Sequence, residues 1–257
     1  MKKEIVSVMK RYELKYVLTE EQVERFKAQI LNHMMIDKYG LTTISSIYYD
    51  TPSYTLLNRS IEKPFYKEKI RLRSYGLIEK ESPVFLEIKR KNDNIVYKRR
   101  ITSTENRVDK FFNENEEFDN EQISRELCAF KEKYGVLEPK YIIIYDRIAY
   151  YKDNSDVRVT LDMNPRYRVD NLNLHTSIEG IPLLNEGEAI LEVKVQHSIP
   201  LWLVEILTKE KIYKSSFSKV GEAHKKELNR RLNEKKIKPT QQTNTNIKGE
   251  YQYGFNF

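Results

Sequence analysis

Basic residues recur at every second position in several short segments of the sequence. In KEKIRLRSY (67–75), Lys69, Arg71 and Arg73 alternate with apolar residues. Residues two apart in a β-strand share one face and lie roughly 6.6–6.8 Å apart. Similar charged alternation recurs at Arg11-x-Glu13-x-Lys15, Glu87-x-Lys89, Lys98-x-Arg100, Arg158 with Asp162, and Glu192-x-Lys194. Such faces predict a polyanion site, because Arg makes bidentate phosphate contacts and Lys supplies a point charge.

Four carboxylates interrupt these basic faces: Glu13, Glu87, Asp162 and Glu192. Oxygen ligands suit Mg²⁺ and Mn²⁺, which usually keep water and substrate phosphates as further ligands. A metal with a cationic cradle is the equipment of phosphoryl transfer. Alternatively, each carboxylate pairs with a cross-strand Arg or Lys and binds no metal. Glu192 is the best candidate for a metal ligand.

The composition favours a globular protein with an anionic partner. The chain has 257 residues, 32% of them charged, and a formal net charge of +7, which favours phosphorylated ligands, nucleic acid or an anionic surface. A solvated Lys-rich surface is the simpler alternative. The single cysteine, the lack of a signal sequence and the lack of an apolar run of about 20 residues predict a cytoplasmic protein. With 8 glycines and no Gly-rich phosphate loop, the sequence disfavours a P-loop or Rossmann site.

Period-two alternation predicts mainly antiparallel strands, and the fold class is α+β. We expect strands over 9–18, 42–50, 67–75, 83–91, 95–102, 141–151, 156–163 and 189–196, and helices over 20–35, 53–61, 121–133, 199–208 and 218–232. Helices covering the apolar strand faces would leave the charged faces inside a barrel; an open sheet with a solvated charged face is the alternative. The four histidines, His33, His175, His197 and His224, show no metal-ligand spacing and are expected at the surface or at caps.

As a set, nine segments resemble the catalytic domain of the vacuolar transporter chaperone (VTC) polyphosphate polymerases, of the CYTH or triphosphate-tunnel superfamily. The resemblance covers about residues 9–225, in family order: RYELKY, YYDTP, KIRLRSYG, FLEIKRK, VYKRRI, YDRIAY, VRVTLD, ILEVK and SSFSK. It implies an eight-stranded antiparallel β-barrel, the triphosphate tunnel, with helices packed outside. We expect this domain at 5–232 and a flexible tail at 233–257.

The resemblance also implies an activity and its residues: Mn²⁺- or Mg²⁺-dependent transfer of the γ-phosphoryl group of ATP to polyphosphate, with release of ADP. The catalytic residues would be Lys219, Arg71 and Arg73, and the metal ligands Glu192, Glu13, Glu87 and Asp162. The phosphates would be bound by Lys15, Lys69, Lys89, Lys98, Arg100, Arg147, Arg158, Lys194, Ser216 and Ser218.

The first strand departs from the superfamily pattern. Much of the superfamily opens with Glu-x-Glu-x-Lys, whereas this chain has Arg11-x-Glu13-x-Lys15, which disfavours a second metal site and simple triphosphate hydrolysis. A tripolyphosphatase or nucleoside triphosphatase of the same fold, and a non-catalytic polyphosphate-binding module, remain the alternatives. Nucleic acid is not an expected partner. The fungal members carry a phosphate-sensing domain and a membrane anchor that this sequence does not show, so a membrane partner protein encoded elsewhere is an expectation.

Overall fold

The computed structural model describes residues 12–237, except residues 63, 80, 93–94, 115 and 120. The chain divides into two units, Met1–His224 and Lys225–Phe257. The first unit contains the sheet, five helices and the beginning of a sixth. In the second, helix α6 continues to Ile237, which is past the expected start of the tail at residue 233. The tail residues 238–257 and Arg11 lie outside the described residues, and the domain boundary stays a prediction.

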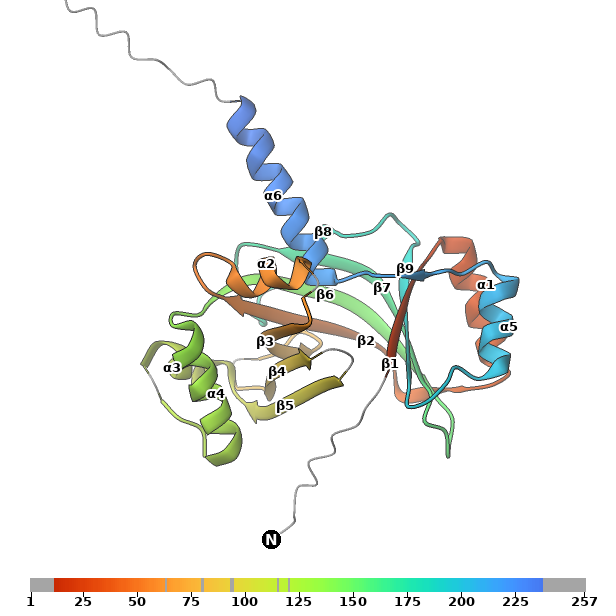
Figure 1. Cartoon of the computed structure of the whole chain (residues 1–257), viewed down its shortest axis with the longest axis horizontal. Coiled ribbons are helices and arrows are strands. Elements are labelled where there is room, and N and C mark those ends of the chain that lie inside the picture. The colour runs from red at the N-terminus through yellow and green to blue at the C-terminus, as the bar shows by residue number, and fades with distance from the viewer. Residues whose placement is uncertain are drawn as a thin grey trace, which may run out of the picture. The chain divides into compact units, whose positions relative to one another are not determined.

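All described strands belong to one antiparallel sheet (Figure 1). They are β1 (Tyr12–Leu18), β2 (Met35–Asp50), β3 (Tyr66–Tyr75), β4 (Val84–Asn92), β5 (Ile95–Ser103), β6 (Glu138–Tyr151), β7 (Arg158–Arg168), β8 (Ile181–Pro182), β9 (Ala189–Val195) and β10 (Lys214–Ser215). The order is β10-β1-β9-β7-β6-β2-β3-β4-β5, with β8 beside β7, and every pair is antiparallel. Eight strands are long, and β8 and β10 have two residues each. The predicted α+β class is therefore confirmed.

The sheet curls so that its two ends approach each other. Among the described residues, no ladder joins β5 to β1 or β10, so hydrogen-bonded closure of a barrel is not seen there. However, Lys89 Nζ on β4, near one end of the sheet, lies 3.2 Å from Glu13 Oε2 on β1, near the other. The faces that carry these two side chains therefore line a shared interior.

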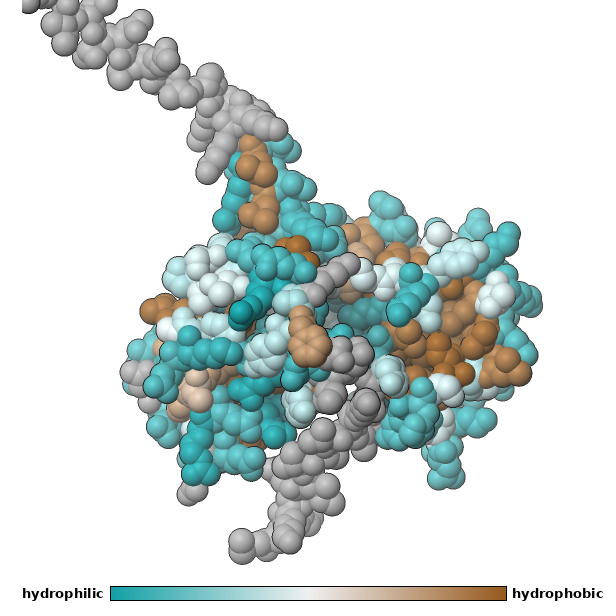
Figure 2. All heavy atoms as spheres, viewed as in Figure 1, coloured by the Kyte–Doolittle hydropathy of each residue, from teal (hydrophilic) through white to brown (hydrophobic). Residues whose placement is uncertain are grey.

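The described residues form six helices: α1 (Glu20–Ile30), α2 (Thr55–Ile61), α3 (Glu105–Glu114), α4 (Glu121–Tyr134), α5 (Leu201–Lys209) and α6 (Lys219–Ile237). Of these, α1, α3, α4 and α5 cover the opposite face of the long strands. Helices α1 and α5 lie side by side and share one apolar core with β1, β7 and β9, whereas α3 and α4 share another with β3 and β4 (Figure 1). Figure 2 shows apolar atoms gathered where α1 and α5 pack on the sheet. Because the apolar strand faces are buried outward, the charged faces point inward, as the barrel alternative predicted.

Helix α1 is shorter than its sequence pattern indicates. The predicted helix over 20–35 ends at Ile30, and Met35 already begins β2. Met35 pairs with Tyr151 and Ile36 with Tyr150, so pairing with β6 overrides the helical pattern. At the other end the prediction holds: Thr19 and Gln22 form a capping box.

No helix in the described part of the chain has both the length and the apolar character needed to cross a membrane.

Candidate functional site

Ten basic side chains and four carboxylates lie on the inner face, which we define by these residues. The basic ones are Lys15, Lys69, Arg71, Arg73, Lys89, Lys98, Arg100, Arg147, Lys194 and Lys219, and the acidic ones Glu13, Glu87, Asp162 and Glu192. They come from β1, β3, β4, β5, β6, β7, β9 and the first residue of α6. The strand pleat is the physical reason, because it sends every second side chain to the same face.

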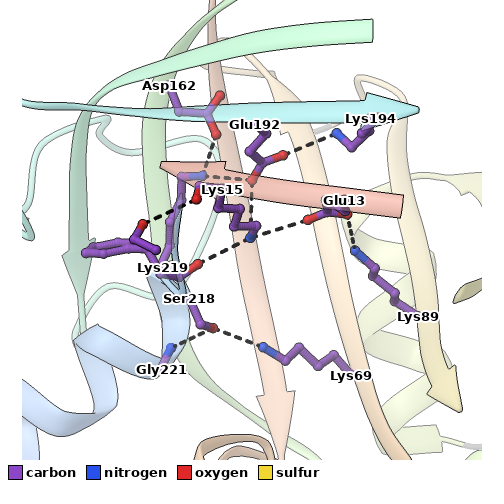
Figure 3. A network of polar contacts seen from close by, with 12 residues as sticks. Glu13, Lys15, Lys69, Lys89, Asp162, Glu192, Lys194, Ser218, Lys219 and Gly221 are labelled. Atoms are coloured by element: carbon purple, nitrogen blue, oxygen red, sulfur yellow. Dashed lines mark hydrogen bonds and ion pairs between the residues drawn. The ribbon is translucent and has the colours of Figure 1, made fainter. Parts of the chain in front are cut away.

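Lys15 connects the carboxylates of β1 and β9 (Figure 3). Its Nζ lies 3.4 Å from Glu13 Oε1 and 3.3 Å from Glu192 Oε1, and it donates to the carbonyl oxygen of Phe217 at 3.3 Å. Lys15 and Glu192 are direct register partners on β1 and β9. The second oxygen of Glu192 accepts from Lys194 Nζ at 3.2 Å. Glu192 therefore lies between two lysines.

Asp162 is fully buried and has two cationic partners. Arg147 Nε lies 2.5 Å from Asp162 Oδ1 and Arg147 Nη2 lies 2.7 Å from Oδ2, a bidentate contact, and Lys219 Nζ contacts Oδ2. Lys219 Nζ also lies 3.5 Å from Glu192 Oε1 and 4.4 Å from the ring centroid of Tyr145. Lys219 thus joins the β7 and β9 carboxylates from outside the sheet.

Glu87 forms the centre of a second charged cluster. Arg71 Nη2 and Lys98 Nζ each lie 2.8 Å from a Glu87 oxygen, and Arg100 Nε donates to Glu87 Oε1 at 2.6 Å. Arg71 and Arg100 are the register partners of Glu87 on its two neighbouring strands. The sequence left two roles open for Glu87, a metal ligand or a cross-strand ion pair. The structure shows ion pairs.

Lys69 and Arg73 differ from their neighbours because neither has a carboxylate within ion-pair distance among the described residues. Arg73 is 6% exposed and donates to Ser46 Oγ at 3.2 Å and to Tyr145 Oη at 3.1 Å. Lys69 donates to Ser218 Oγ at 3.2 Å. A buried cation without a counter-charge is costly unless an anion joins it.

Burial and the excess of cations over carboxylates on the inner face shift the pKa values of its charged groups. Burial raises the pKa of Glu13, but Lys89 and Lys15 outweigh it and lower that pKa to about 2. Burial acts the same way on Glu192 and Asp162, and the surrounding cations hold the pKa of both below its usual range. Burial lowers the pKa of Lys69 to about 8; Tyr48 opposes this effect, and Lys15, Lys67 and Lys89 add to it. The site favours charged carboxylates and weakens the charge on Lys69.

The beginning of α6 packs against the same side of the sheet that carries the inner-face charges. We call Ser218–His224 the α6 start. Ser218 caps the helix as predicted, since its Oγ accepts from Gly221 N at 3.3 Å. Val220 and Ala223 are buried against a third apolar cluster that includes Ile143 of β6. Ile143 alternates with Tyr145 and Arg147, so this cluster belongs to the inner face.

Two predicted site residues are exposed, whereas most inner-face residues are not. Arg158 begins β7 with the same strand parity as Asp162, but its side chain is 58% exposed and lies 3.5 Å from Asp37 Oδ2. Ser216 is exposed and precedes the α6 start. Their predicted phosphate contacts stay predictions.

Tyrosine hydroxyls complete the inner face, and sequence reasoning found only one of them. Tyr145 shares the Arg147 face, which the alternation indicated. Tyr48 accepts a hydrogen bond from Arg71 Nη1 at 3.0 Å; burial raises its pKa, but Arg71, Lys69 and Arg73 lower it to about 8. The sequence signal for Tyr48 is its spacing of two residues from Ser46 on β2, which puts both side chains on one face.

The donors fit a divalent ion only in part. No group of three Asp, Glu, His or Cys side chains suited to a metal occurs in the described ranges. Asp162 and Glu87 are each held by two or three cations. Glu13 and Glu192 also have cationic partners, but these lie farther away, at 3.2–3.5 Å, and both carboxylates share Lys15 Nζ. Two carboxylates and substrate phosphates meet the needs of Mg²⁺ or Mn²⁺, so these two residues would hold the ion.

Comparisons with known proteins give a family and several distant structures. The model of the VTC domain family matches residues 10–228. Similar solved structures include a candidate adenylate cyclase from Bacillus halodurans (14% identity, TM-score 0.49, covering 82% of this chain and 96% of that one). HpAC1 from Hippeastrum, an adenylyl cyclase candidate described as having a dominant triphosphatase activity, shares 13% identity (TM-score 0.47, 82% and 93% covered). No curated protein is significantly similar in sequence.

The family match covers most of the chain, including every strand that contributes to the inner face. The chain therefore belongs to the VTC domain family of the triphosphate-tunnel superfamily, whose members are enzymes that act on phosphate compounds.

Proposed function

We propose that this protein is a polyphosphate polymerase that uses ATP and a divalent ion, Mn²⁺ or Mg²⁺. A terminal oxygen of the polyphosphate chain would form a bond to the γ-phosphorus of ATP, the bond from that phosphorus to the β,γ-bridging oxygen would break, and ADP would leave. The membership of the VTC family supports a reaction on phosphate chains.

The observation that carries the proposal is the uncompensated positive charge at Lys69 and Arg73. The inner face has ten cations for four carboxylates, and these two have no acidic partner in the described part of the chain. A polyphosphate chain supplies several charges in a row and would neutralise both. Arg73 would bind one phosphate through its planar guanidinium, and Lys69 with Ser218 would bind another.

Catalysis would then consist of positioning and of charge neutralisation. Arg71 and Arg73, fixed by Glu87, Tyr48, Ser46 and Tyr145, are pre-oriented donors for the transferred group. Lys219 reaches the same interior from α6 and would neutralise the developing charge. A divalent ion at Glu13 and Glu192 would supply charge neutralisation of the phosphate oxygens. An in-line arrangement of the two reactants accounts for the remaining rate gain.

The first experiment incubates the purified protein with ATP and Mn²⁺ or Mg²⁺, separates the products by size, and quantifies ADP and free phosphate. Long polyphosphate with equimolar ADP and little free phosphate is the expected result. Free phosphate without chains, from ATP or tripolyphosphate, would assign a triphosphatase instead. Tight polyphosphate binding without turnover with either metal would assign a binding module.

A further inference from the structure

His224 is buried, contrary to the expectation of a surface or cap position. It is 2% exposed and lies at the end of the α6 start, five residues after Lys219. Five residues of α-helix span about 7.5 Å, so His224 lies near the charged interior. Both of its ring nitrogens have partners on other elements, Tyr141 on β6 and Asn58 on α2.

The hydrogen bonds of His224 form a chain with a defined direction. The amide nitrogen of Asn58 donates to the carbonyl oxygen of Ser53 at 3.2 Å, which turns Asn58 Oδ1 toward His224. Because an amide oxygen only accepts, His224 Nε2 must carry the proton and donate to it at 2.9 Å. In the neutral ring, Nδ1 is then an acceptor for the Tyr141 hydroxyl, also at 2.9 Å. A single neutral tautomer of His224, on α6, therefore makes both hydrogen bonds, to Asn58 on α2 and to Tyr141 on β6.

Aromatic packing fixes the plane of the same ring. The Tyr54 ring is stacked on His224, with centroids 5.0 Å apart and planes at 24°, and Tyr141 meets it edge-on at 5.8 Å. Lys140 Nζ lies 4.4 Å from the centroid of the Tyr54 ring. Tyr54 has φ of 60°, an uncommon left-handed conformation for a tyrosine, and this conformation is part of the arrangement that places its ring on His224.

We propose that His224 is a positioning residue that sets the rotation and the axial position of the α6 start, and thereby places Lys219 and Ser218 in the site. The apolar contacts of Val220 and Ala223 hold the helix against the sheet but are not directional. A partial turn of the helix, smaller than the roughly 100° between successive residues, would keep Val220 and Ala223 near the sheet yet move Lys219 away from Asp162. The two hydrogen bonds of His224 have one geometry only, so they select one rotation.

The test is a double-mutant cycle of His224→Ala and Lys219→Ala, read by kcat, by KM for ATP and by the Kd of tripolyphosphate. We expect His224→Ala to lower kcat by roughly 10- to 100-fold, because a misplacement of about 1 Å costs on the order of 100-fold. In the Lys219→Ala background the same change should lower kcat by a clearly smaller factor, since only Ser218 of the two positioned residues remains to be misplaced. An equal loss in both backgrounds would overturn the proposal.

Two further variants separate positioning from stability. His224→Asn keeps an amide group near the former Nδ1, and imidazole added to His224→Ala refills the cavity; we expect partial recovery of kcat from at least one of them. His197→Ala, a change at an exposed histidine, is the matched control and should leave kcat unchanged. A melting temperature that recovers without any recovery of kcat would contradict positioning.

The inference rests on the proposed function only for its kcat readout. If the unmodified protein turns over no triphosphate, the proposed function fails, and the cycle is decided by tripolyphosphate affinity. His224→Ala should then weaken affinity in the Lys219-containing protein and weaken it by a clearly smaller factor in Lys219→Ala, where only Ser218 remains to be misplaced. Weakening by the same factor in both would refute the positioning role on its own.

Discussion

At the scale of single residues, the inner face separates its cations into two classes. Lys15, Arg147 and Lys219 neutralise Asp162 and Glu192 and fix their positions. Lys69 and Arg73 instead have only neutral hydrogen-bond partners in the described chain. The alternation in the sequence predicted that these side chains share a face, but it could not distinguish the classes, because pairing depends on cross-strand register.

Among the four inner-face carboxylates, Glu192 has the largest number of cationic neighbours. Its oxygens lie 3.2–3.5 Å from Lys15, Lys194, Lys219 and Arg147. Glu192→Gln keeps the shape and removes the charge, so kcat should fall on the order of 100-fold or more. Tripolyphosphate should still bind, and more tightly, because one repulsive carboxylate is gone.

Isothermal titration with tripolyphosphate, together with the rate of ADP formation, checks the Glu192 prediction. The exposed Glu186→Gln is a matched control that should change neither quantity. Unchanged turnover in Glu192→Gln would exclude both the metal role and the electrostatic role of this carboxylate.

The lowered pKa of Lys69 leads us to expect proton uptake when a polyanion binds. Its pKa is about 8 in the empty site, because burial and then Lys15, Lys67 and Lys89 disfavour the charged form, whereas an ordinary lysine has a pKa of about 10.4. A bound phosphate raises this pKa again, so binding near pH 8 takes up protons. The affinity for tripolyphosphate should therefore decrease as pH rises through about 8.

Calorimetry at pH 8 in two buffers with different ionisation enthalpies measures this uptake. Lys98 also has a pKa of about 8, since burial lowers it more than Glu87 raises it, so part of the uptake belongs to Lys98. Lys69→Arg, which stays charged, should remove the Lys69 part only. The same uptake in Lys69→Arg would refute the assignment.

At the scale of elements, local sequence signals predicted the element types well and their ends less well. The capping box at Thr19 and Gln22 marked the beginning of α1 correctly. The end of α1 was misplaced, because the pairing of Met35 with Tyr151 joins residues far apart in the sequence. The hairpin of β4 and β5 was predicted correctly, since it depends on neighbouring residues. The neighbours β2–β6 and β7–β9 required tertiary information.

Helix α1 provides a test of an element that is separate from the charged interior. Thr19→Ala removes the acceptor for Gln22 N and should lower the free energy of unfolding by about 1 kcal/mol, within a range of about 0.5–2 kcal/mol. Urea unfolding measures the loss, and Thr19→Ser, which keeps the hydroxyl, should restore most of it. Turnover at a temperature well below melting should stay unchanged, because α1 packs on the outer face of the sheet. A large fall in turnover would show that α1 also shapes the inner face.

At the scale of the whole sheet, the excess of cations on the inner face means that the empty protein stores electrostatic repulsion. Lys69, Arg73 and their neighbours are held together by the apolar cores on the outer face, and the repulsion lowers the net stability. An anion that binds only the folded state removes this repulsion. At a concentration of 100 times its Kd, such a ligand stabilises the fold by about 2.7 kcal/mol.

Tripolyphosphate should therefore raise the melting temperature strongly at low salt, and less at high salt, because the Debye length shortens from about 10 Å at 0.1 M to about 3 Å at 1 M. Orthophosphate at equal ionic strength is the control and should have a much smaller effect, since it cannot contact Lys69 and Arg73 on β3 and Lys219 on α6 together. Scanning calorimetry at two salt concentrations compares the two anions. Equal shifts with both would mean that the inner face responds to ionic strength alone. A larger shift with tripolyphosphate that disappears in Arg73→Met would locate the effect at one of the two cations that lack a carboxylate partner in the described chain.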